Sequence, residues 1–293
     1  MEINIAQVST EKVQWNQWDQ KDIEVSMLRL DRIHPLISGN KWFKLRYYLE
    51  DALRLGKKNI ITFGGAWSSH ILATAAACKM HDLGCTGIIR GEEPGNYSST
   101  LRQAASLGMK FVFSSRASYR DKQIPDIGIH DYLVPEGGYG LLGAAGAATI
   151  LDYCNKKNYT HICCAAGTGT MLAGIATEAE AGTTVIGISV LKNNSDLEKQ
   201  IDALLPASNH NYQVFHEFHN GGYAKYNPGL LTFMNRYFSA TNIPTDFVYT
   251  GKLCYAVNEL ILRDHFPKGS NILLIHSGGL QGNDSLEKGT LIF

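Results

Sequence analysis

Residues 38–45 read SGNKWFKL and place one lysine, Lys41, between a polar turn and an apolar run. Serine, glycine and asparagine favour a turn or a helix cap, and the apolar residues that follow have roughly helical spacing. The pattern predicts a helix that begins beside Lys41. Burial and the positive end of a helix both disfavour an ammonium, so Lys41 is predicted to be a reactive amine. These eight residues alone favour the alternative, a solvated surface lysine.

The composition is that of a globular protein without a strong charge imbalance. The chain has 293 residues, of which 44% are hydrophobic and 18% charged, and its formal net charge is zero. This length predicts two domains. The absence of a basic stripe argues against nucleic acid as a partner. No apolar run reaches about 18 residues and residues 1–8 lack a signal-peptide pattern, so no membrane partner and a cytoplasmic location are expected.

The cysteines and histidines give no metal pattern. The six cysteines include no Cys-x-x-Cys pair and no zinc-ligand spacing, so reduced, packed thiols are predicted. His216 and His219 lack a third ligand nearby in the sequence. No metal is therefore expected.

Short apolar runs alternate with helical stretches from residue 59 onward. This alternation predicts an α/β fold with open, twisted, mostly parallel sheets and helices on both faces. Residues 114–128, which include Pro125, are predicted to form a connection, and Ser195 and Pro206 to cap and stop one helix. The predicted strands are 59–63, 85–89, 109–113, 132–134, 162–165, 185–190, 214–218 and 271–275. The predicted helices include 97–107, 171–180, 195–205, 228–238 and 253–263, with an alanine-rich helix running to about residue 156.

Two glycine-containing turns follow predicted strands, where ligands collect in sheets of this kind. The turn GTGT at 167–170 offers backbone amides and threonine hydroxyls to an anion such as a phosphate. A purely structural strand-to-helix turn is the alternative. The stretch GGAWSSH at 64–70 suits a carboxylate at a helix start, with Ser68 close to the reacting atoms. There the alternative is a plain capping serine.

These stretches, together with PEGG at 135–138, YTGK at 249–252 and HSGG at 276–279, resemble one enzyme family. They are similar to the pyridoxal-phosphate enzymes of fold type II, related to the tryptophan synthase β chain, in the branch of 1-aminocyclopropane-1-carboxylate deaminase and D-cysteine desulfhydrase. The resemblance implies pyridoxal 5'-phosphate as cofactor and a homodimer. It also implies a larger cofactor-binding domain from residues 1–43 and 135–293, with a smaller inserted α/β domain at 44–134.

The resemblance further implies roles for single residues. Lys41 forms the Schiff base with the cofactor, and Ser68 and Tyr249 act with it in catalysis. The substrate binds at Ser68, Ser69 and His70, although the family often has asparagine where Ser69 stands. The implied cofactor-binding residues are Lys41, Asn40, Ser69, Gly167, Thr168, Gly169, Thr170, Thr250 and Ser277.

Two positions separate the branches of the family. Thr250 and Ser277 match the desulfhydrase pattern, whereas the deaminases carry a glutamate and a leucine there. The resemblance thus implies β-elimination from D-cysteine, with Lys41 taking the Cα proton, to give pyruvate, ammonia and sulfide. One alternative is deamination of 1-aminocyclopropane-1-carboxylate to 2-oxobutanoate and ammonia. Another is a protein that binds a small molecule or the cofactor without turnover.

Overall fold

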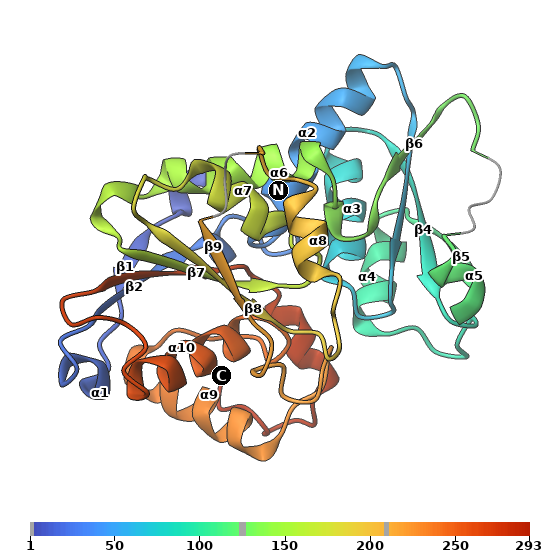
Figure 1. Cartoon of the computed structure of the whole chain (residues 1–293). Helices are drawn as coiled ribbons and strands as arrows, with labels where there is room; N and C mark the ends of the chain where they lie inside the picture. Colours follow the sequence, from blue (N-terminus) through green and yellow to red (C-terminus); the bar gives the residue numbers. More distant parts are fainter. Residues whose placement is uncertain (1–2, 123–126, 208–210) are drawn as a thin grey trace.

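The computed structural model describes residues 3–122, 127–207 and 211–293. Figure 1 shows two sheets side by side, each with helices packed against it. The larger sheet has the strand order β1-β2-β10-β7-β8-β9, and only the pair β1 and β2 is antiparallel. Its strands are β1 (Thr10–Lys12), β2 (Glu24–Arg29), β7 (His161–Ala166), β8 (Thr184–Ser189), β9 (Tyr212–Phe215) and β10 (Asn271–His276).

The smaller sheet is entirely parallel, with the order β5-β4-β3-β6. Its strands are β3 (Asn59–Gly64), β4 (Gly84–Arg90), β5 (Lys110–Ser114) and β6 (Asp131–Val134). In register, Gly64 at the end of β3 lies opposite Ile89, so Arg90 projects from the same carboxyl edge of the sheet. The predicted α/β fold with mostly parallel sheets is confirmed.

Helices cover both sheets. They are α1 (Asn16–Asp19), α2 (Asn40–Arg54), α3 (Ser69–Met80), α4 (Ser99–Ser106), α5 (Arg116–Arg120), α6 (Leu141–Ala148), α7 (Thr170–Glu178), α8 (Leu197–Asp202), α9 (Pro228–Thr241) and α10 (Thr250–Leu262). No helix in these described ranges has the length and apolar character needed to cross a bilayer.

The central strands of the larger sheet are buried on both faces. Cys163 of β7 and Leu274 of β10 pack in a core with α9 and α10, whereas the next residues, Cys164 and Ile275, pack in a core with α6 and α7. Figure 1 shows these two helix pairs on opposite sides of the sheet. Burial on both faces explains why these strands read as continuous apolar runs rather than as alternating ones.

Helix α2 packs against both sheets. Phe43 belongs to the core of the larger sheet, whereas Leu45 and Leu49 belong to the core that covers β3 and β4. Full burial of each such side chain stabilises the fold by about 1.5–3 kcal/mol. The start of α2, which carries Lys41, is therefore held where the two sheets meet.

Several predicted boundaries were wrong. Strands β1 and β2 and helix α5 were not predicted, and α5 lies in the stretch expected to be a connection; Pro125 lies outside the described residues. The residue before helix α8 is Asp196 rather than Ser195, its side chain makes no capping hydrogen bond, and the helix ends at Asp202. Helix α10 starts at Thr250, earlier than predicted, because Asp246 binds the amides of its first turn.

Other elements are shorter than expected. The alanine-rich helix α6 ends at Ala148 and gives way to a 3-10 segment, Thr149–Tyr153. Strand β9 ends at Phe215 and pairs with β8 at the edge of the larger sheet. The division into domains at residues 44 and 134 stays a proposal. All four strands of the smaller sheet fall inside that range, and its first boundary falls within α2.

Candidate active site

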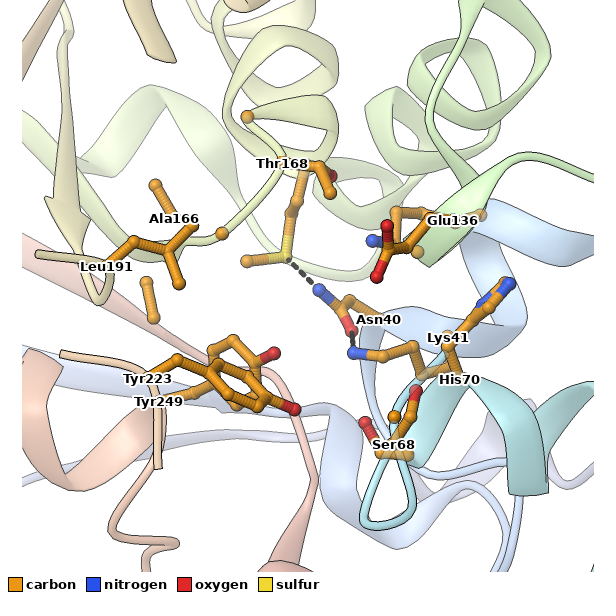
Figure 2. A pocket seen from close by; sticks show the side chains of 18 of the residues that line it. Asn40, Lys41, Ser68, His70, Glu136, Ala166, Thr168, Leu191, Tyr223 and Tyr249 are labelled. Atoms are coloured by element: carbon orange, nitrogen blue, oxygen red, sulfur yellow. Dashed lines mark hydrogen bonds between the residues drawn. The ribbon is translucent and has the colours of Figure 1, made fainter. Parts of the chain in front are cut away.

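A pocket of about 250 Å³ lies where strand ends and helix starts of the two sheets converge. Figure 2 shows side chains from both sides pointing into it. The lining residues that matter below are Asn40, Lys41, Lys44, Gly65, Ser68, Ser69, His70, Arg90, Glu136, Gly167, Thr168, Gly169, Tyr223 and Tyr249. The structure thus brings together most of the predicted site residues from distant parts of the chain.

Lys41 is the second residue of α2 and is only 8% exposed. Its Nζ donates a hydrogen bond to Asn40 Oδ1 at 2.7 Å and lies 5.4 Å from the centroid of the Tyr249 ring. Burial lowers the pKa of Lys41 to about 8, although the negative charge of Asp246 opposes the shift. With this pKa, roughly a tenth of the amine is neutral at pH 7, far more than of a lysine with an ordinary pKa, and this makes Lys41 a good nucleophile. The solvated-lysine alternative is wrong.

The position of Lys41 depends on the glycine before it. Gly39 has φ +67°, and a Cβ there would lie 1.9 Å from the carbonyl oxygen of Ser277. That carbonyl accepts a hydrogen bond from the backbone N–H of Asn40 at 3.3 Å. Only glycine lets the start of α2 approach the turn after β10 this closely.

The turn at 167–170 joins β7 to α7. Gly169 adopts φ +77° against Ile201, and the hydroxyls of Thr168 and Thr170 lie 2.9 Å apart. Thr170, the first residue of α7, is fully buried and lies just behind the pocket lining. The unpaired amides of the first helical turn and the Thr168 hydroxyl form an anion-binding arrangement.

Lys44 supplies a cation next to this turn. A Cβ on Gly137 would lie 3.9 Å from Lys44 Nζ and 3.1 Å from the methyl group of Thr168, so the amine and the turn are neighbours. Within the described residues, no carboxylate pairs with Lys44. Burial and the charge of Lys41 lower the pKa of Lys44 well below its usual value. A bound anion would compensate both effects.

His70 lines the pocket and has one ring nitrogen without a hydrogen-bond partner in the described part of the chain. Its Nε2 lies 2.9 Å from the hydroxyl of Thr62, which donates its own proton to the carbonyl of Val134. Nε2 must therefore carry the ring proton, and Nδ1 is buried without a partner in the described part of the chain. Burial and the charges of Lys44 and Lys41 lower the pKa of His70 well below its usual value, so the ring is neutral.

Ser68 and Ser69 lie at the start of α3. The Oγ of Ser68 caps this helix by accepting a hydrogen bond from the N–H of Ile71 at 3.4 Å, as the capping alternative predicted. Both serines also line the pocket. The capping role and a place in the pocket thus coexist, and the helix start presents amides to a ligand.

Tyr249 closes the side of the pocket opposite α3. Its ring meets that of Tyr223 edge-on, with centroids 6.3 Å apart, and Figure 2 shows the two side by side. Burial raises the pKa of Tyr249 well above its usual value, so the hydroxyl stays protonated. Asp246 holds Tyr249 in place: its carboxylate accepts the N–H of Val248 at 3.0 Å and of Tyr249 at 2.8 Å.

Thr250 and Ser277 are buried, but neither lines the pocket. The N–H of Thr250 donates to Asp246 at 2.9 Å, and Ser277 meets the start of α2 through its carbonyl. The cofactor contacts expected from their hydroxyls stay predictions.

The sequence did not single out Lys44, Asp246, Tyr223 or Arg90. One signal for Lys44 was available, because it stands three residues after Lys41 and so lies on the same face of α2. Arg90 ends a parallel strand, where ligands collect. Asp246 accepts hydrogen bonds from the amides of residues 248–250, a local capping arrangement before α10 that the sequence analysis missed. No local pattern marked Tyr223.

Comparison with known proteins agrees with this chemistry. A family model described as "Pyridoxal-phosphate dependent enzyme" matches residues 6–278. The chain belongs to the pyridoxal-phosphate dependent enzymes. Its cofactor is pyridoxal phosphate.

Similar pyridoxal-phosphate dependent enzymes include a putative 1-aminocyclopropane-1-carboxylate deaminase of Thermotoga maritima. It is 30% identical over 271 residues, which is 84% of this chain and 85% of the relative. The bifunctional D-cysteine desulfhydrase/1-aminocyclopropane-1-carboxylate deaminase of Arabidopsis thaliana is 27% identical over 283 residues, covering 84% and 70%. A crystal structure of an ACC deaminase homologue shares the fold, with a TM-score of 0.81, 24% identity and coverage of 94% and 90%.

The pocket fits this cofactor on structural grounds. It combines a buried amine of lowered pKa at Lys41, an anion-binding turn beside the unpaired Lys44, and the unpartnered Nδ1 of His70. No cluster of three His, Cys, Asp or Glu side chains occurs in the described ranges.

Proposed function

We propose that this pyridoxal-phosphate enzyme is a D-cysteine desulfhydrase-like lyase, which converts D-cysteine to pyruvate, ammonia and sulfide. The observation that carries the proposal is the buried Lys41 amine, with a pKa of about 8, facing Tyr249 in a pocket that ends at an anion-binding turn. The choice of reaction rests on Thr250 and Ser277, where a hydroxyl replaces the glutamate and the leucine expected of a deaminase.

The cofactor would be held at both ends of the pocket. Lys41 would bind its aldehyde covalently through Nζ, with Asn40 orienting the amine. The amides and hydroxyls of the turn at 167–170, together with Lys44, would bind its phosphate. Thr250, Ser277 and Ser69 are the remaining residues we assign to the cofactor. If the hydroxyls of Thr250 and Ser277 contact the ring nitrogen of the cofactor, they would leave it less firmly protonated than a carboxylate would.

The chain's own residues then handle the substrate. Amides at the start of α3, with Ser68, Ser69 and His70, bind the α-carboxylate. Pyridoxal phosphate, when bound, withdraws electrons from Cα and so makes its proton easier to remove. Lys41 takes that proton at Nζ, because about half of its amine is neutral at pH 8. Tyr249, which keeps its hydroxyl proton, donates to the leaving sulfur.

A second candidate is deamination of 1-aminocyclopropane-1-carboxylate. The name of the Thermotoga maritima relative favours it. The same lysine, tyrosine and carboxylate-binding helix start would serve that reaction, so substrate tests must separate the two.

The test incubates holoenzyme with D-cysteine, L-cysteine, D-serine and 1-aminocyclopropane-1-carboxylate, and follows sulfide, pyruvate and 2-oxobutanoate. Lys41→Ala is the control, because cysteine also reacts with free cofactor. We expect sulfide and pyruvate from D-cysteine with wild type and none above background with Lys41→Ala. Lysine-dependent 2-oxobutanoate without sulfide would assign the chain to the deaminase reaction. A protein that binds the cofactor but turns over none of the four substrates would contradict both proposals.

We also propose that the enzyme is a cytoplasmic homodimer. The support is the family resemblance and the lack of a bilayer-spanning helix in the described ranges. Sedimentation equilibrium of the holoenzyme tests the dimer, and a monomer mass of 32.3 kDa would contradict it.

A further inference from the structure

Arg90 lines the same pocket but belongs to none of the roles assigned above. It is the last residue of β4, on the carboxyl edge of the smaller sheet, and it is exposed. Its Nη2 atom lies 3.9 Å from the place where a Cβ on Gly65 would stand. Because Gly65 has no side chain, the guanidinium is open to the loop that leads into α3.

The guanidinium of Arg90 has no carboxylate partner among the described residues. Its Cζ atom lies 6.0 Å from the centroid of the Tyr119 ring, at the distance of a weak cation–π contact. Other arginines of this chain, such as Arg29 and Arg263, pair with carboxylates. A planar, always charged guanidinium that lines a pocket without an anion is suited to bind one from a ligand.

The acidic residue of the pocket does not compete for Arg90. Glu136 accepts the hydroxyl proton of Tyr119 at 2.6 Å with one carboxylate oxygen and pairs with Lys122 through the other. Lys122 also lies 4.4 Å from the centroid of the Tyr119 ring. Both carboxylate oxygens of Glu136 are thus engaged by Tyr119 and Lys122, which leaves the guanidinium of Arg90 open to an anion from a ligand.

Arg90 acts on a different side of the pocket from the two inner lysines. The charge of Lys41 lowers the pKa of Lys44, and the charges of both lysines lower the pKa of His70. The positive charge of Arg90 instead partly offsets the burial that raises the pKa of Tyr119 and Tyr223. The phosphate end of the pocket is served by Lys44, so Arg90 is available to a substrate group.

We infer that Arg90 forms a subsite for a second anionic group, so that an amino acid whose side chain ends in a carboxylate, sulfonate or phosphate binds more tightly than a neutral amino acid of the same shape. This inference rests on the proposed function, because it takes the α-carboxylate to be bound at the start of α3. The side chain of the amino acid then extends toward Gly65 and Arg90. The subsite sets specificity and takes no part in moving protons.

The test compares two ligands of nearly equal shape, aspartate and asparagine, each as the D- and the L-enantiomer. Calorimetry on the holoenzyme gives their dissociation constants without relying on turnover. We expect wild type to bind aspartate more tightly than asparagine. Arg90→Gln should weaken aspartate binding on the order of tenfold and asparagine binding by less than about threefold. Arg90→Lys should keep part of the preference, because it keeps the charge.

Arg116→Gln is the matched control, since Arg116 is exposed and lies outside the pocket lining. It should change neither dissociation constant. Added salt should reduce the preference of wild type for aspartate. Equal weakening of both ligands by Arg90→Gln would overturn the subsite, because Arg90 would then bind the α-carboxylate. Equal affinity of wild type for both ligands would overturn it as well.

Measuring sulfide release from D-cysteine shows which of the two proposals fails, the Arg90 subsite or the lyase activity. Sulfide production without an Arg90-dependent preference for aspartate would support the lyase proposal and contradict the subsite. An Arg90-dependent preference for aspartate without sulfide production would support the subsite and contradict the lyase proposal.

Discussion

Lys41 and Lys44 lie about one helical turn apart on α2 and are buried in the same pocket. Two ammonium groups this close repel each other, and the charge of Lys41 lowers the pKa of Lys44. A phosphate beside Lys44 would relieve this repulsion and favour its charged form. The neighbouring Lys41 would then be the amine that gives up its proton. One helix thus presents an anion-binding lysine and a nucleophilic lysine.

The lowered pKa of Lys41 predicts how fast the cofactor attaches at different pH values. Only the neutral amine attacks an aldehyde. At pH 8 about half of Lys41 is neutral, against under roughly 1% of a lysine with an ordinary pKa. We therefore expect the rate of borohydride-stable cofactor incorporation into apoprotein to rise with pH and to reach half its maximum near pH 8. A midpoint near 10.5 would show that the burial of Lys41 does not shift its pKa.

Lys44→Met should stabilise the apoprotein but weaken its binding of the cofactor. The change removes a buried amine that has no carboxylate partner, so the apoprotein should become more stable by about 1 kcal/mol or more. Loss of the cation should raise the dissociation constant for pyridoxal phosphate about tenfold or more. Urea unfolding and cofactor titration measure the two effects. Lys79→Met, at an exposed position of α3, is the control and should change neither. Unchanged cofactor affinity in Lys44→Met would contradict the proposal that Lys44 binds the phosphate.

At the scale of elements, the site consists of the starts of α2, α3, α7 and α10 and the loops that precede them. Each start follows a turn whose geometry depends on glycine, on a capping side chain or on a buried carboxylate. Apolar spacing and glycines are local signals, so strands β3, β4, β7 and β10 and helices α2 and α7 could be predicted from the sequence. The true start of α10 could not, because the carboxylate of Asp246 lies outside the apolar run that marks the helix.

Two glycines with the same φ angle test how much the close contact between Gly39 and Ser277 contributes to placing the start of α2. Gly39 and Gly56 both have φ +67°, but a Cβ on Gly39 would overlap the carbonyl of Ser277, whereas nothing lies within 4 Å of a Cβ on Gly56. Gly56→Ala should cost about 1–2 kcal/mol of unfolding free energy, from backbone strain alone. Gly39→Ala should cost about 3 kcal/mol or more, because the helix start must also move. Urea unfolding measures both.

The same pair should differ in cofactor attachment. Gly39→Ala displaces Lys41, so borohydride-stable incorporation should fall sharply, and Gly56→Ala should incorporate normally. Equal costs in stability and equal incorporation for the two variants would mean that the contact with Ser277 does not position Lys41.

At the scale of the whole molecule, the pocket lies where two sheets meet, and α2 joins their cores. The sheets contribute different chemistry. The larger one supplies the turn at 167–170 and Tyr249, and the smaller one supplies the start of α3 and Arg90. Cofactor and substrate would therefore contact groups from both sheets.

The sequence by itself determined the α/β fold, the lysine at the start of a helix, the glycine turn and the enzyme family, because these depend on local spacing and on short motifs in a fixed order. Only the tertiary structure decided which charges meet in the pocket. Lys44 beside Thr168, the charge of Asp246 acting on Lys41, and Arg90 next to Gly65 are pairs formed by packing. Burial and the distance between charges set the pKa values and the electrostatic potential of the site, and both arise only when distant segments come together.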